Sequence, residues 1–266
     1  MKAFRVKIHG MNKTIIRFFY LLVSLFACML GSCNSSGPAS PTDNSIVFNP
    51  GLAYDSLIDI SGNKYHTITI GTQTWMASNL RVTKYLNGDL IGTTSHVTKD
   101  ISSESSPEYQ WAYNGEEKNV AKYGRLYTWY AITDSRKIAP QGWHVASDAD
   151  WATLEAYLSV NMGTSPNIVK ALAGTTDWVG AADTLKLAIN SGLSLNNSSG
   201  FTALPGGRRY ATGSFNGLGK FGYFWSSSEY DTNTAFYEIM GYSNNEMEKS
   251  NFSKKYGYSV RCLKDN

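Results

Sequence analysis

Cysteine is scarce in this chain, which has three cysteines in 266 residues: Cys28, Cys33 and Cys262. Only Cys262 lies beyond the N-terminal 33 residues. A single thiol cannot close an internal disulfide, supply a cysteine-rich zinc site or act as a redox dithiol. Because Cys262 lies in the alternating run Tyr258–Leu263, we predict a strand there and a buried, structural thiol.

Charged residues are also few, at 17% of the chain. Five of the 24 basic residues precede Cys33 and no acidic residue does, so the rest of the chain carries 19 basic and 21 acidic side chains. The chain after Cys33 therefore lacks the excess of lysine and arginine that neutralises nucleic-acid phosphates, which excludes nucleic-acid binding. A hydrophobic content of 42%, with 13% aromatic residues, excludes wholesale disorder and predicts one sizeable core.

Long apolar runs are absent, since crossing a bilayer takes about 20 residues. The run FFYLLVSLFACML at 18–30 has 13 residues and follows a basic stretch, which is typical of a secretory signal. It ends at Leu30-Gly31-Ser32-Cys33, which resembles the bacterial lipobox. We therefore predict a lipoprotein signal peptide over residues 1–32, starting at Met1 or Met11, and lipidation of Cys33. An ordinary secretory signal with a chance cysteine is the alternative.

Residues 34–45, NSSGPASPTDNS, are small, polar and contain proline, and the predicted tether extends over 33–52. They predict a flexible tether that follows the lipidated cysteine. The folded domain is then expected over residues 53–266.

The domain mixes helical and strand patterns and is expected to be α+β. The capping pair Ser147 and Asp150, followed by apolar residues at 151, 154 and 158, predicts a helix that ends before Gly163. A hairpin is expected over 57–80, a long surface excursion over 87–120, a helix-like segment over 123–131 and a second helix over 167–173. Further strands are expected at 201–204, 223–226, 235–240 and 258–263.

Several short sequence motifs, in this order, closely resemble those of the Fibrobacter succinogenes major paralogous domain. The resemblance extends from about residue 57 to 264. The motifs are DISGNKY at 59–65, IGTQTWM at 70–76, NL at 79–80, YGRLYTWYA at 123–131, APQGWHV at 139–145, GFTALPGGR at 200–208, WSSSE at 225–229 and SVRC at 259–262. The resemblance implies a C-type lectin-like fold, here without disulfides, in a secreted or lipid-anchored bacterial surface protein. It implies no settled activity, so function is argued from sites.

Known catalytic and metal-binding patterns are missing. The sequence has no His-Glu-x-x-His, no G-x-S-x-G and no phosphate-binding loop, and the tripeptides with which C-type lectins hold calcium are absent. Glu229 and Asp231 carry oxygens that suit calcium, although a solvated turn is the favoured interpretation. His144 is expected to be a hydrogen-bonded structural residue. No enzyme activity, metal or cofactor is therefore expected, although two placed carboxylates would suffice for a glycosidase.

Aromatic side chains interleaved with polar ones are the remaining indication of a binding site, because sugars stack on aromatic faces. Core packing is favoured for Trp75, Trp129, Trp143, Trp151 and Trp225. The candidate ligand-binding residues are Trp111, Tyr113, Arg208, Arg209, Tyr210, Glu229, Tyr230 and Asp231. For Trp111 and for Arg208–Tyr210, surface recognition and structural packing stay open.

Together these features predict a lipid-anchored extracytoplasmic protein that binds glycan or another cell-envelope component without catalysis. We expect it at the outer membrane, on the periplasmic face or at the cell surface. A structural or adhesive subunit with a protein partner is one alternative, and an uncharacterised hydrolase is another. The tripeptides Asp55-Ser56-Leu57 and Asp183-Thr184-Leu185 also resemble bacterial O-glycosylation sites.

Overall fold

The computed structural model describes residues 46–161, 168–179, 196–243 and 246–265. All of them belong to the compact unit Ser40–Asn266. Within the described part of the chain, no helix combines the length and the apolar character that crossing a bilayer requires. The described domain is mainly built of strands with a few short helices, which confirms the α+β class.

The first sheet has five strands in the order β1-β2-β3-β12-β6. Its strands are β1 (Asp55–Ile58), β2 (Lys64–Ile70), β3 (Gln73–Met76), β12 (Cys262–Lys264) and β6 (Trp143–Val145). The first three form the predicted hairpin, closed by turns at 59–63 and 71–72. The C-terminal β12 lies between β3 and β6 and is antiparallel to both, so the end of the chain joins the sheet where it began.

The second sheet has the order β11-β10-β9-β7-β8. Its strands are β7 (Gly206–Arg209), β8 (Phe215–Leu218), β9 (Phe221–Glu229), β10 (Thr234–Gly241) and β11 (Glu248–Ser253), while β4 (Gln110–Trp111) and β5 (Leu126–Tyr127) form a separate pair. Gly207 has φ +66°, and a Cβ there would lie 2.7 Å from backbone atoms of β8. The β7–β8 hairpin therefore requires glycine at this position.

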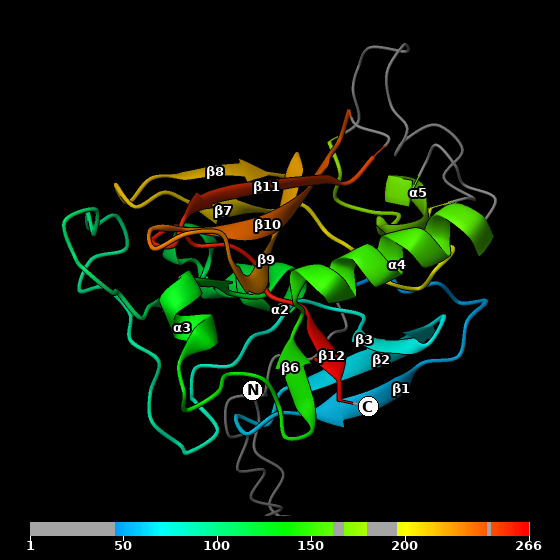
Figure 1. Ribbon diagram of the computed structural model, residues 1–266, viewed down its shortest axis with the longest axis horizontal. Coiled ribbons are helices and arrows are strands. Elements are labelled where there is room, and N and C mark those ends of the chain that lie inside the picture. Colours follow the sequence, from blue (N-terminus) through cyan, green and yellow to red (C-terminus); the bar gives the residue numbers. More distant parts are fainter. Residues whose placement is uncertain (1–45, 162–167, 180–195, 244–245, 266) are drawn as a thin grey trace, which may run out of the picture. The chain divides into compact units, whose positions relative to one another are not determined.

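The helices are short except for α4 (Asp148–Asn161). Figure 1 shows α4 on the right, between the two sheets, and also α2 (Val120–Tyr123), α3 (Trp129–Thr133) and α5 (Ile168–Leu172). The 3₁₀ turns Tyr113–Gly115 and Glu117–Asn119 precede α2. At the start of α4, the Ser147 N–H donates to the Asp150 carboxylate at 2.8 Å and the Asp150 N–H donates to the Ser147 hydroxyl at 3.3 Å. This reciprocal pair is the predicted capping box.

The core consists of two large clusters and one small one. Helix α4 buries Trp151, Leu154 and Leu158 against both sheets in the first cluster, which also contains Trp75. Trp225 lies in the second cluster. Trp75, Trp151 and Trp225 are fully buried, which confirms their predicted core role, whereas Trp129 and Trp143 are only partly buried.

A buried arginine joins distant segments of this core. The Arg261 guanidinium donates to the side-chain oxygen of Asn79 at 2.7 Å and to the backbone oxygens of Met76, Phe201 and Thr202 at 2.7–2.9 Å. Its neighbour Cys262 is a free, buried cysteine, as predicted, and burial raises the pKa of its thiol. The described residues contain no disulfide, and the guanidinium links the segments by hydrogen bonds instead.

Some local expectations differ from the structure. The segment 123–131 is not one helix, because it contains the end of α2, strand β5 and the start of α3. Residues 201–204 contribute only an isolated bridge, and 258–263 pairs as a strand mainly from Cys262 onward. Strands β8 and β11 have too few apolar residues to be recognised from alternation. Ile46 is buried and Phe48 packs on the core, so the folded part starts before the expected boundary at residue 53.

Candidate functional site

Trp111, Tyr113 and Arg209 lie inside the domain. Trp111 and Tyr113 are 2% and 7% exposed, and Arg209 has no exposed surface. The Arg209 guanidinium lies 4.1 Å from the centre of the Trp111 ring and donates to the backbone oxygens of Val97 and Lys99 at 3.0 and 2.6 Å. Burial lowers the pKa of Arg209 to about 10. Trp111 and Arg209 thus hold part of the 87–120 excursion on the core, which corrects the expected surface position of that excursion around Trp111 and Tyr113.

Arg208 and Tyr210 form a half-buried stacked group. The Arg208 guanidinium lies 4.5 Å from the centre of the Tyr210 ring and 4.7 Å from that of Tyr223. It also donates to the Tyr210 hydroxyl at 2.5 Å. Tyr210 packs edge-on against Tyr256. A ligand-binding role for Arg208 and Tyr210 stays a prediction.

Glu229, Tyr230 and Asp231 lie at the exposed turn between β9 and β10. Glu229 pairs with Lys254, and Asp231 accepts two backbone N–H groups of the turn at 2.8 and 2.7 Å. These backbone hydrogen bonds lower the pKa of Asp231. Among the described residues, no group of three His, Cys, Asp or Glu side chains is placed to hold a metal ion.

The predicted residues therefore do not form one site. No hydrogen bond, ion pair or ring contact within the described ranges joins the 229–231 turn to Trp111 or to Arg208. Ser56 is exposed on the edge strand β1. Cys33 and Asp183-Thr184-Leu185 lie outside the described residues.

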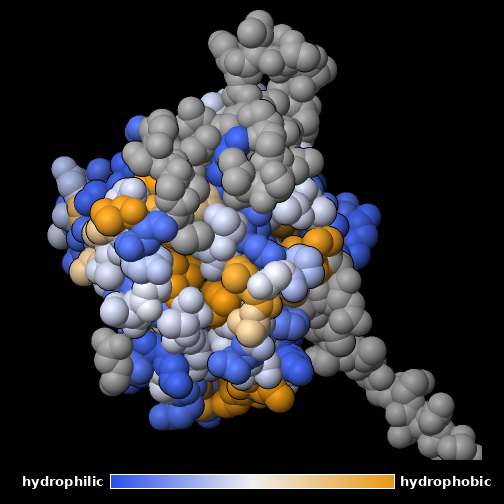
Figure 2. Space-filling model, turned by 90° about the vertical axis from the view of Figure 1, so that its right-hand side faces the viewer, coloured by the Kyte–Doolittle hydropathy of each residue, from blue (hydrophilic) through white to orange (hydrophobic). Residues whose placement is uncertain are grey.

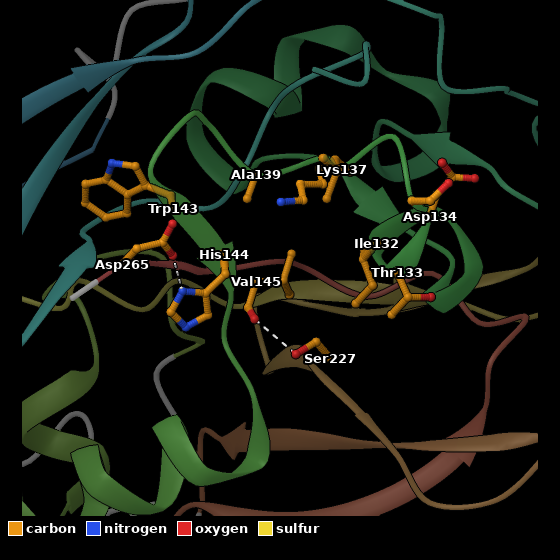
Figure 3. Close-up of a pocket in the computed structure, with 12 residues that line it drawn as sticks. Ile132, Thr133, Asp134, Lys137, Ala139, Trp143, His144, Val145, Ser227 and Asp265 are labelled. Atoms are coloured by element: carbon orange, nitrogen blue, oxygen red, sulfur yellow. Dashed lines mark hydrogen bonds and ion pairs between the residues drawn. The ribbon is translucent and has the colours of Figure 1, made fainter. Parts of the chain in front are cut away.

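The structure instead forms an open cleft of about 450 Å³ between α3, β6, β9 and the C-terminal end, within the size range of small-ligand sites. Apolar side chains of Ile132, Ile138, Ala139 and Val145 line it together with a larger number of polar residues. Figure 3 shows Ile132 and Thr133 on one side, His144 and Asp265 on the other, and Lys137 along the upper edge.

Strand pairing determines the His144 side of the cleft. Antiparallel pairing of β6 with β12 places His144 opposite Leu263, so Asp265 follows immediately beyond the pair. The two nitrogens of the His144 ring lie 2.7 Å from an Asp265 oxygen and 3.2 Å from an Asp150 oxygen. Both ring nitrogens are thus engaged, as the prediction of a hydrogen-bonded histidine requires.

The opposite side of the cleft carries a loop with mixed charges. Arg136 donates to the Asp134 carboxylate at 2.7 Å and 2.9 Å and lowers the pKa of that carboxyl. Lys137 has φ +58°, is exposed, and makes no ion pair with any residue in the described ranges. Its ammonium group is therefore available to a ligand, while Asp134 already has its counter-ion.

At two points of the cleft, polar groups of the described lining residues are engaged with the protein. The Ser227 hydroxyl donates to the Val145 backbone oxygen at 3.1 Å (Figure 3), and His144 is held by two carboxylates. A nucleophilic mechanism requires hydrogen-bonded contact between nucleophile and base. The cleft therefore presents apolar wall groups beside hydroxyl, ammonium and carboxylate groups, without a hydrogen bond from the Ser227 hydroxyl to a side-chain base among the described residues.

The cleft residues were missing from the candidates because they come from four separate segments. The phrase APQGWHV at 139–145 belongs to the resemblance but carries no obvious binding chemistry. The only local sequence feature that could have indicated the cleft is the mixed-charge stretch Asp134-Ser135-Arg136-Lys137.

Comparison with known proteins identifies a family for most of the chain. The family model described as the Fibrobacter succinogenes major domain matches residues 68–264. Searches of curated proteins and of solved structures gave no match.

Proposed function

Because this chain belongs to the Fibrobacter succinogenes major domain family, we propose that it is a lipid-anchored extracytoplasmic protein whose domain binds glycan without catalysis. The C-type lectin-like fold remains part of this proposal. Membership of the family specifies no activity, so the proposal depends on the cleft and on the N-terminal segment.

The observation that carries the proposal is the 450 Å³ cleft with the available Lys137 ammonium at its edge. A sugar presents apolar C–H surfaces and hydroxyls on the same ring. In the cleft, Ile132 and Ala139 supply apolar contacts, while Thr133, Lys137 and Asp265 supply donors and acceptors. Neutral and weakly charged glycans fit this mixture better than a strongly anionic polymer does.

The lipid anchor is proposed from residues 18–33. Acyl chains on Cys33 would hold the protein at the outer membrane, since each buried CH₂ contributes about 0.8 kcal/mol. Incorporation of an alkyne-labelled fatty acid by the native chain, and its loss in Cys33→Ser, is the expected result. Equal labelling of the two proteins would refute the assignment of Cys33.

Protein partners remain the alternative, although exposed apolar groups give no clear docking surface. The large exposed hydrophobic side chains of the described residues come from different segments, among them Ile58, Leu90 and Val160. Figure 2 shows apolar groups separated by polar ones on the visible face. Such scattered exposure is normal for a protein surface.

A glycan array probed with the full-length chain in detergent tests the proposal. We expect selective binding that falls about tenfold in Lys137→Gln, because a charged hydrogen bond contributes about 1.5–3 kcal/mol. Lys118→Gln is the matched control, since Lys118 is 78% exposed and does not line the cleft. Parallel arrays with calcium and with chelator test a cation requirement.

Absence of selective binding on the array would refute glycan recognition and favour a protein partner. Binding that Lys137→Gln and Lys118→Gln reduce equally would place the glycan outside the cleft.

A further inference from the structure

A second cleft, of about 240 Å³, lies beside β4 and the two 3₁₀ turns. Its lining includes Thr93, Gln110, Trp111, Glu117 and Arg125, none of which lines the larger cleft. The volume is below the usual range for drug-sized ligands. A single sugar ring or a short organic acid is therefore the size of ligand that suits it.

Gln110 gives this cleft a side-chain amide whose nitrogen is not engaged by a described residue. The residue is 7% exposed, and its side-chain oxygen accepts from Arg125 Nη1 at 2.9 Å. The amide nitrogen makes no hydrogen bond to a residue in the described ranges. The amide nitrogen is not sealed from solvent, so a ligand acceptor can take the place of water at this position.

Arg125 supplies the positive charge. Its side chain is only 12% exposed, whereas its partner Glu117 is 67% exposed. The Glu117 carboxylate accepts from Nη1 at 3.1 Å and from Nη2 at 2.5 Å, which is a two-point pair. A buried guanidinium is thus paired with the end of an exposed, rotatable side chain.

The lining of the cleft offers several hydrogen-bond donors to an incoming acceptor. Gln110 and Arg125 present N–H groups, and the exposed Thr93 presents a hydroxyl. The Trp111 indole nitrogen already donates to Thr94 at 2.9 Å. An incoming carboxylate would accept from Arg125 at two points and from the Gln110 amide, and this geometry is the one that guanidinium recognises best.

We propose that this cleft binds the carboxylate of a small acidic ligand, and that Glu117 occupies the carboxylate position when the ligand is absent. A uronic acid fits best, because its ring places hydroxyls beside Thr93 while its carboxylate lies on Arg125. Displacing Glu117 costs little, because the incoming carboxylate takes over its pairing with Arg125. Glu117 returns to water when it leaves.

Titration calorimetry of the full-length chain in detergent tests this inference, with D-glucuronate as probe and D-glucose as its neutral counterpart. We expect D-glucuronate to bind and D-glucose to bind at least about tenfold more weakly. Glu117→Gln removes the competing charge and should tighten D-glucuronate binding by about threefold to fivefold. Arg125→Lys keeps the positive charge but loses the planar guanidinium that donates to a carboxylate at two points, so the affinity for D-glucuronate should fall by about tenfold.

Succinate distinguishes the two sources of a carboxylate. Weaker binding of succinate than of D-glucuronate supports an acidic sugar, and equal binding supports a carboxylate site without sugar selectivity. Equal binding of D-glucuronate and D-glucose, or no gain in Glu117→Gln, would overturn the inference. Because Glu117 is exposed, Glu117→Gln tests the cleft even where Arg125→Lys fails to fold. We expect Lys137→Gln to leave D-glucuronate binding unchanged, which separates this cleft from the larger one.

Discussion

Glu238 makes the stability of this protein depend on pH. The residue lies on β10, is 1% exposed, and one of its carboxylate oxygens has no hydrogen-bond partner among the described residues. Its strand neighbours are Phe224 on β9 and Lys249 on β11. Burial, together with the negative charges of Glu155 and Asp148 on α4, raises the pKa of Glu238 from 4.5 to about 8, and only Lys249 opposes this rise.

The direction of the effect follows from the raised pKa. The folded protein holds the Glu238 proton more tightly than the unfolded chain, so the stabilisation is complete below about pH 4.5. It is lost progressively as the pH rises and is gone above about pH 8. Each pKa unit corresponds to about 1.4 kcal/mol, so the loss in the free energy of unfolding is at most about 5 kcal/mol.

Glu238→Gln should remove most of this dependence, because glutamine has the shape of the neutral carboxyl and does not ionise. Urea unfolding of the native protein and the variant at pH 5, 7 and 9 measures the difference. We expect similar stability at pH 5 and a variant that is several kcal/mol more stable at pH 9. Glu248→Gln is the matched control, because Glu248 is exposed on the neighbouring β11 and should give parallel curves.

Native and variant curves that stay parallel from pH 5 to pH 9 would refute the reasoning. Glu238 would then be ionised throughout, with a counter-charge or water reaching the carboxylate. A variant that is less stable at pH 9 would show that the charged form is the one that the fold favours.

Two further changes test how the fold is held together. Arg261→Met should lower the free energy of unfolding by about 3–5 kcal/mol, because four buried oxygens lose their donor. Urea unfolding measures this loss. A midpoint close to that of the native protein would show that water replaces the guanidinium. Ser147→Ala should lower the free energy of unfolding by about 1 kcal/mol, because α4 loses its N-terminal cap. Circular dichroism should show a lower melting temperature. An unchanged melting temperature would mean that Asp150 caps the helix alone.

Local signals predicted the elements that short stretches of sequence specify. The hairpin over 57–80 has alternation and turn residues, and α4 has both a capping box and three apolar positions on one face. Cys262 was predicted as buried because its run alternates. In each of these cases the neighbours along the chain supply most of the structural information.

Other elements depend on contacts that the sequence does not reveal locally. The edge strand β11, with the sequence EKSNFS, forms through its pairing with β10 and contains a single aromatic residue. The polar excursion 87–120 is anchored by Ile101 and Trp111, which are buried with Ala211 far along the chain. The larger cleft combines residues 132–139, 143–145, 227 and 265. No window of the sequence contains such a combination.

Arginine next to aromatic residues was the least reliable of the indications, because core and surface use the same residue types. Arg209 and Arg261 stack on buried rings and direct their N–H groups mainly at backbone oxygens, so their charge serves packing. Arg125 instead donates to two side chains, one of them largely exposed. The partners of an arginine therefore distinguish the two roles. A guanidinium bound to backbone carbonyls has no capacity left for a ligand, whereas one bound to an exposed carboxylate can exchange it for another.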